Sequence, residues 1–189
     1  LLPLANSAFA AEASLASLVE KKQFDEAVVL VESGVDVNRP SVDGTTALHW
    51  ASYYGELDLA RRLVRAEADP DTRNTYGSTP LGEAATKGDL PMIELLLDAG
   101  ANVESENPEG QTALMAVART GNIEAAKLLL DNGADIQASE GWGGQTALHW
   151  AAARKHPEMV SFLIENGAQV DVRGIDRNWA RRVTSEPRM

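Results

Sequence analysis

Apolar residues recur along the chain in two alternating kinds of segment, both with helical spacing. One kind is short: residues 47–54 are followed by Gly55, and the corresponding segments further along the chain are followed by Gly88 and Gly121. Longer segments with apolar residues three and four positions apart cover 58–65, 91–99, 124–132 and 157–166. Glycine also follows most of these, and a glycine in the left-handed conformation commonly ends a helix. The pattern predicts pairs of short helices and an all-α fold.

The paired segments repeat with a period near 33 residues. The hexapeptide TALHWA occurs at 46–51 and again at 146–151, and degenerate copies lie at 79–84 and 112–117. The leucines of these four copies are separated by steps of 33, 33 and 34 residues: Leu48, Leu81, Leu114 and Leu148. Such a period indicates a stacked array, in which each unit buries its apolar face only against its neighbours.

Each complete unit begins with a glycine turn and a threonine, a residue that favours the first position of a helix because its hydroxyl accepts a free backbone N–H. Residues 11–40 contain two helical segments but no threonine turn, so we expect an N-terminal capping unit. The four complete units cover 41–73, 74–106, 107–139 and 140–173.

Three positions depart from the glycine pattern at the ends of helices. Glu67 stands where the other complete units have glycine after the second helix, and Lys22 and Lys155 replace glycine after the first. We expect a positive φ at Glu67, where a side chain costs roughly 1 kcal/mol.

The units resemble the ankyrin repeat over about residues 11–173. The four stretches that carry the resemblance are GTTALHWASYYGELDLARRLV, GSTPLGEAATKGDLPMIELLLDAGANV, GQTALMAVARTGNIEAAKLLLDNGADI and GQTALHWAAARKHPEMVSFLIENGAQV. The resemblance implies an ankyrin-repeat solenoid of helix-turn-helix units with β-turn fingers. It also implies a non-catalytic protein that binds partners in a concave groove, and a structural role for His49 and His149.

The charge and the missing motifs narrow the possible functions. The formal net charge is −11, and an acidic surface repels phosphate backbones, which argues against a nucleic-acid partner. The absence of cysteine excludes disulfides and thiolate metal sites. Asp69-Pro70-Asp71 resembles the start of a calcium loop, but its twelfth position is Pro80 instead of glutamate. Because phosphate-loop, zinc-protease and nucleophile-elbow motifs are also missing, we expect no catalytic residue, cofactor or metal.

Residues that the fold leaves free are the candidates for partner binding. On fingertips and the exposed side of the first helix, the resemblance places seven aromatic or cationic residues: Tyr53, Tyr54, Tyr76, Lys87, Arg119, Trp142 and Arg154. Such residues are common interface anchors. We therefore expect a monomer that binds a protein partner without spanning a membrane. Trp50 and Trp150 are expected to pack between repeats, His156 to face solvent, and the turn around Trp142 to be flexible.

The two ends of the chain do not follow the period. Residues 1–10 end in Ala8-Phe9-Ala10, a pattern expected before a signal-peptidase cut, and predict the remnant of a signal peptide in a secreted or periplasmic bacterial protein. Residues 174–189 form a basic tail or linker. We expect the chain to be a fragment. The alternative function is a non-catalytic part of a longer secreted protein or enzyme, with its active domain beyond residue 189.

Overall fold

The computed structural model describes residues 14–171, which form ten α-helices and no strand. The helices are α1 (Leu15–Glu20), α2 (Phe24–Glu32), α3 (Ala47–Tyr54), α4 (Leu57–Arg65), α5 (Pro80–Lys87), α6 (Leu90–Asp98), α7 (Ala113–Ala118), α8 (Ile123–Asp131), α9 (Ala147–Ala153) and α10 (Pro157–Glu165). The all-α prediction is confirmed. The predicted signal remnant at 1–10 and basic tail at 174–189 lie outside the described residues.

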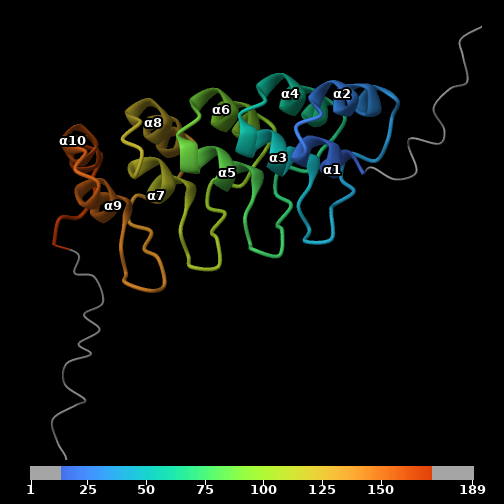
Figure 1. Cartoon of the computed structure of the whole chain (residues 1–189). Coiled ribbons are helices and arrows are strands. Elements are labelled where there is room, and N and C mark those ends of the chain that lie inside the picture. The colour runs from blue at the N-terminus through green and yellow to red at the C-terminus, as the bar shows by residue number, and fades with distance from the viewer. Residues whose placement is uncertain (1–13, 172–189) are drawn as a thin grey trace, which may run out of the picture.

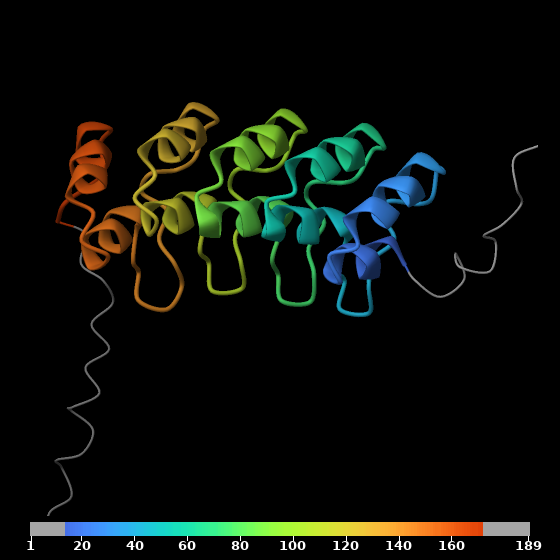
Figure 2. The ribbon, with the colours of Figure 1, turned by 45° about the horizontal axis from the view of Figure 1, so that its top comes forward.

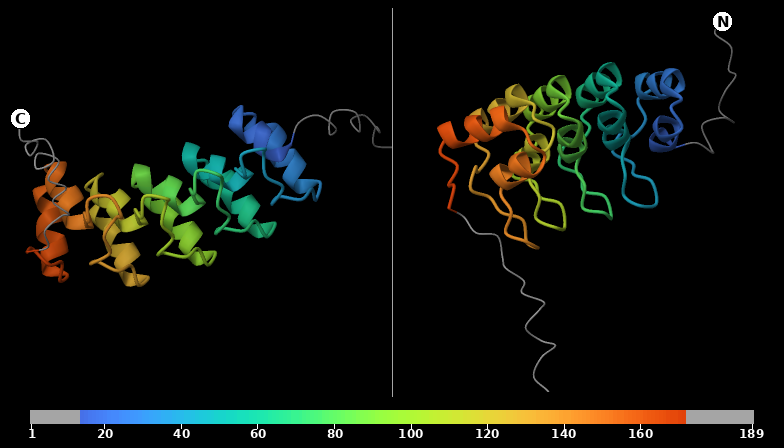
Figure 3. Two further views of the ribbon diagram at one scale, coloured as in Figure 1. Left: turned by 90° about the horizontal axis from the view of Figure 1, so that it is seen from below. Right: turned by 60° about the vertical axis from the view of Figure 1, so that its left-hand side comes forward.

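The helices form two parallel rows (Figure 1). An inner row contains the odd-numbered helices, each in contact with the next, and an outer row contains the even-numbered ones. Four loops project from the inner row, away from the outer helices (Figures 1 and 2), and we call them fingers 1 to 4: residues 41–45, 74–78, 107–111 and 140–145. Views from below and from the side show the helix pairs following one another along one array (Figure 3). This arrangement is the predicted solenoid.

Threonine starts each inner helix that follows a finger. The hydroxyls of Thr79 and Thr112 accept hydrogen bonds from the backbone N–H three residues later. Thr46 and Thr146 form capping boxes with His49 and His149, so two backbone donors are satisfied at each of these helix starts.

Two rows of leucines form the centre of the core. The first row is the periodic set predicted above, and all four of its side chains are buried: Leu48, Leu81, Leu114 and Leu148. The second row lies on the outer helices and follows the same period: Leu63, Leu96, Leu129 and Leu163. Full burial of one leucine contributes about 1.5–3 kcal/mol. In a repeat array these side chains are covered partly by the adjacent units, so the stability of each unit depends on its neighbours.

A ladder of side-chain hydrogen bonds joins successive units, and sequence reasoning missed it. A side-chain oxygen accepts a backbone N–H from the next unit at four positions spaced 33 residues apart, over distances of 2.7, 2.7, 2.9 and 3.2 Å: Asn38, Asp71, Glu104 and Gln137. The two amide side chains also donate to the next unit, Asn38 to the carbonyl of Glu67 and Gln137 to that of Gly167. The ladder fixes the spacing of the units along the loops that follow the outer helices.

The three departures from glycine adopt the left-handed conformation. Lys22, Glu67 and Lys155 have φ values of 59°, 64° and 61°. The expectation at Glu67 is thereby confirmed, since a residue with a Cβ is strained in this region.

The variant Glu67→Gly should be more stable than the wild type by roughly 1 kcal/mol, because glycine removes the steric strain at φ 64°. The bond from Asn38 ends on the backbone carbonyl and survives the change. Chemical denaturation would measure the gain. The neighbouring Ala66→Gly is the control: Ala66 has φ −89° and gains nothing from glycine, so its stability should fall. A Glu67→Gly protein no more stable than the wild type would contradict the assignment of strain.

Candidate functional site

Each finger is a tight turn whose shape is set by its own side chains. The fingers are closed at the base by backbone hydrogen bonds, for example from Asn74 N to Ser78 O at 3.1 Å and from Asn107 N to Gln111 O at 3.1 Å. In finger 1, the hydroxyl of Ser41 donates to the Asp43 carboxylate, and the backbone N–H of Thr45 does the same. These bonds, Ser41 first, lower the pKa of Asp43, so its charge persists under mildly acidic conditions.

Finger 4 is organised around a buried carboxylate. Glu140 is 5% exposed, and its carboxylate accepts hydrogen bonds from the backbone N–H groups of Trp142, Gly143 and Gln145 at 2.5, 2.7 and 3.2 Å. The structure shows the turn around Trp142 closed by these three hydrogen bonds, and its flexibility stays a prediction. The glycines of the turn suggested freedom, whereas the Glu140 carboxylate binds the backbone of the fingertip from within.

Backbone hydrogen bonds join the fingers in two pairs. Thr75 N donates to Asp43 O between fingers 1 and 2, and Gly141 N donates to Glu109 O between fingers 3 and 4, both at 2.8 Å. Pro108 occupies the equivalent position in finger 3 and has no N–H to donate. Among the described residues, no backbone hydrogen bond joins fingers 2 and 3.

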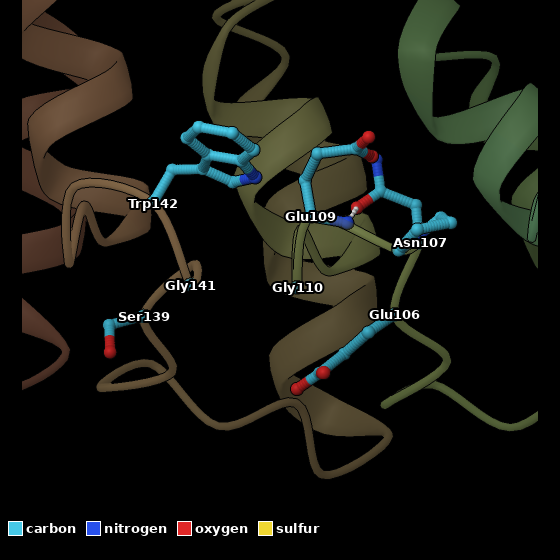
Figure 4. A pocket seen from close by; sticks show the side chains of 8 residues that line it. Glu106, Asn107, Glu109, Gly110, Ser139, Gly141 and Trp142 are labelled. Carbon is cyan, nitrogen blue, oxygen red and sulfur yellow. Dashed lines mark hydrogen bonds between the residues drawn. The ribbon is translucent and has the colours of Figure 1, made fainter.

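An open hollow of about 430 Å³ lies between fingers 3 and 4 (Figure 4). Trp142 and Glu109 extend over this space from the two fingers, and Glu106 lies nearer the base of finger 3. Trp142 is 65% exposed, and Tyr76 at the tip of finger 2 is 70% exposed. The structure thus presents both fingertip aromatics to solvent.

Helix α3 carries an aromatic cluster. The rings of Trp50 and Tyr54 stack with centroids 5.8 Å apart, and Tyr53 meets both of them edge-on. Tyr54 is half-buried and its hydroxyl donates to the carbonyl of Glu20 at 3.0 Å, so this candidate residue ties the first unit to the second. Tyr53 remains 43% exposed. Trp50 and its counterpart Trp150 are partly buried against the core, as expected.

Cations from neighbouring helices lie over two of these aromatic rings. The Nζ atom of Lys87 is 4.5 Å from the centroid of Tyr53, and the Cζ atom of Arg119 is 5.2 Å from that of Trp150. Arg154 is exposed just after α9. The structure therefore brings Tyr53 and Lys87 together, and it places Tyr76 and Trp142 on fingers 2 and 4.

The histidines have structural hydrogen bonds. His49 is buried; its Nδ1 accepts from Thr46 N at 3.2 Å, and its Nε2 therefore donates to the carbonyl of Ser78 at 3.0 Å in the next unit. Burial lowers the pKa of His49 and keeps the ring neutral. His156 was expected to face solvent, and this was wrong: its Nε2 lies 3.0 Å from the carbonyl of Arg119 in the preceding unit. No group of three or more metal-ligating side chains occurs within residues 14–171.

Comparison with known proteins identifies the repeat. The family model described as ankyrin repeats (3 copies) matches residues 15–107 and, overlapping them, residues 84–174. No curated protein matches the chain. Within the described part of the chain, none of the helices is long and apolar enough to cross a bilayer. The matches cover most of the sequence and coincide with the observed units, so the chain belongs to the ankyrin-repeat family.

Proposed function

We propose that this protein is a non-catalytic recognition module that binds a protein partner through its finger–helix face. This face consists of the exposed and half-buried side chains of the fingertips and of the inner helices and their C-terminal ends. It includes the seven candidates, of which Tyr54 and Arg119 are half-buried: Tyr53, Tyr54, Tyr76, Lys87, Arg119, Trp142 and Arg154. The observation that carries the proposal is the exposure of Tyr53, Tyr76 and Trp142 on this face. Ankyrin repeats generally serve as protein–protein interaction modules.

The distribution of exposed apolar side chains supports the choice of face. Among the described residues, the large apolar side chains exposed on the outer helices are the aliphatic Val29 and Ile164, whereas every exposed aromatic ring belongs to a finger or to α3. Aromatic residues are enriched in interfaces because they bury much area for few rotatable bonds.

Two of the aromatic anchors are held in place before any partner arrives. Glu140 fixes the backbone at Trp142, and Trp50, Tyr54 and Lys87 surround the ring of Tyr53. An ordered anchor loses little conformational entropy on binding, so more of its contact energy contributes to affinity. In the alternative function, this chain is the non-catalytic part of a longer protein whose active domain lies beyond residue 189. The same face would bind the protein partner in that case as well.

Affinity capture from an extract of the source organism tests the proposal. The baits are the full chain and its Tyr53→Ala/Tyr76→Ala/Trp142→Ala variant. The variant Val29→Ala/Ile164→Ala is the matched control, because it removes exposed apolar side chains from the outer helices. We expect a partner to be retained by the wild type and the control and lost from the triple variant, with similar melting temperatures for all three. Equal retention by the triple variant would show that binding uses another surface.

A further inference from the structure

The inner row of helices is rich in positive charge, although the whole chain carries a net charge of −11. Six cations lie within inner helices or in the two residues after them: Lys21, Lys22, Lys87, Arg119, Arg154 and Lys155. The same positions hold four carboxylates, Glu20, Glu56, Glu83 and Asp89, so cations are in excess there. Glu83 already accepts a hydrogen bond from the Ser78 hydroxyl at 2.6 Å, and Asp89 accepts one from the Met92 backbone N–H at 3.3 Å. Most of the acidic side chains lie on the outer helices, in the loops and on the fingers.

None of these six cations forms an ion pair within residues 14–171. The one ion pair found among the described residues joins Arg62 and Glu32 on outer helices. Lys22, Lys87 and Arg119 instead lie over aromatic rings, and each of these contacts bridges two neighbouring units. The backbone carbonyls at the C-terminal end of a helix carry partial negative charge, and this charge stabilises a lysine or arginine side chain placed there. Contact with a ring face also leaves N–H donors free to bind an incoming anion.

We infer that the partner segment lying along the inner helices is an acidic stretch of protein, a specification that rests on the proposed function. Its carboxylates would bind Lys87, Arg119 and Arg154, which come from three successive units. Packed helices are about 8–10 Å apart, and a peptide in the polyproline II conformation advances about 3.1 Å per residue with about three residues per turn, so every third side chain points to the same side. The segment therefore carries an aspartate or glutamate at about every third residue.

The acidic residues at the fingers favour binding of an acidic peptide over binding of a nucleic acid. Asp43, Glu106 and Glu109 lie on or beside the fingers and would repel a nucleic-acid backbone, whose charge is continuous. A peptide can place neutral or basic residues toward the fingers and acidic residues toward the helices. Charge complementarity of this kind determines specificity and association rate more than total affinity.

Selection from a random linear peptide library against the full chain tests the inference. We expect the selected peptides to contain Glu or Asp about three residues apart. A synthetic peptide of this kind should bind the Lys87→Glu/Arg119→Glu/Arg154→Glu variant at least about tenfold more weakly than the wild type, and salt should weaken its binding to the wild type. The control Arg61→Glu/Arg65→Glu/Lys127→Glu changes the charge equally on exposed outer-helix positions and should bind like the wild type.

Other results separate this inference from the proposed function. If charge reversal unfolds the protein, the glutamine versions of the same three positions should still weaken binding. Non-acidic selected peptides that fail to bind the Tyr53/Tyr76/Trp142 alanine variant would overturn the inference and leave the proposed function standing. A single-stranded oligonucleotide that displaces the peptide at equal concentration would also overturn it. No enrichment at all would overturn the inference, and the affinity capture would still decide the proposed function. Peptides that bind both this alanine variant and the charge-reversal variant as tightly as the wild type would contradict both.

Discussion

Replacing Leu114 with alanine should lower the free energy of unfolding by about 2–5 kcal/mol. Leu114 is 1% exposed in α7, the inner helix between α5 and α9, so helices on both sides enclose the cavity that the substitution creates. A cavity that its surroundings cannot close loses dispersion contacts in addition to the transfer energy of the deleted atoms. The shift of the denaturation midpoint of the full chain would measure the loss.

The variant Leu148→Ala is the matched comparison, because Leu148 occupies the same motif position in the last described unit. It is 8% exposed, and α9 has an inner-row neighbour on one side only, α7, within the described residues. A space left there is closed less completely, so the expected loss is smaller. Equal losses at Leu114 and Leu148 would contradict the view that stability depends on packing from both sides.

The variant Gly121→Ala is expected to cost about 2–4 kcal/mol. Gly121 has φ +78°, and a Cβ at this position would come within 2.7 Å of the His156 Nδ1 atom in the next unit. The ring cannot move aside freely, because its Nε2 lies within hydrogen-bond distance of the Arg119 carbonyl. Backbone strain and steric overlap each contribute about 1–2 kcal/mol. Thermal and chemical denaturation would measure the change.

The variant Gly133→Ala separates these two effects. Gly133 lies in the same unit with φ +91°, and a Cβ there would have no other atom within 4 Å. It should therefore show the backbone strain alone, about 1–2 kcal/mol. The difference between the two variants measures the contact with His156, and no difference would mean that the ring moves away without cost.

The repeat architecture could be predicted from the sequence because its determinants are local and recur. Threonine, leucine and glycine return at one period, and each has a local effect on a cap, a core contact or a helix end. The strain at Glu67 was predictable for the same reason, since the other units show which residue the backbone favours at that position.

The features that were missed depend on contacts between units. The Tyr54 hydroxyl reaches a carbonyl 34 residues away, and His156 reaches one 37 residues away. Glu140 was missed for a different reason: its partners are nearby, but its carboxylate turns into its own loop. Tyrosine, histidine and glutamate also occur on exposed surfaces, so their residue type does not show whether they make an internal hydrogen bond. That depends on the rotamer of the side chain and on the spacing of the units.

Pro108 interrupts the backbone hydrogen bonding between neighbouring fingers. Fingers 1 and 2 form one bonded pair and fingers 3 and 4 the other, with Tyr76 on the first pair and Trp142 on the second. Between the two pairs, the Arg73 guanidinium donates to the Glu106 carbonyl near the base of finger 3. Separation of the tips of fingers 2 and 3 would therefore break no backbone hydrogen bond between them. A partner that contacts both Tyr76 and Trp142 would bridge the two pairs of fingers at the point where the backbone does not connect them.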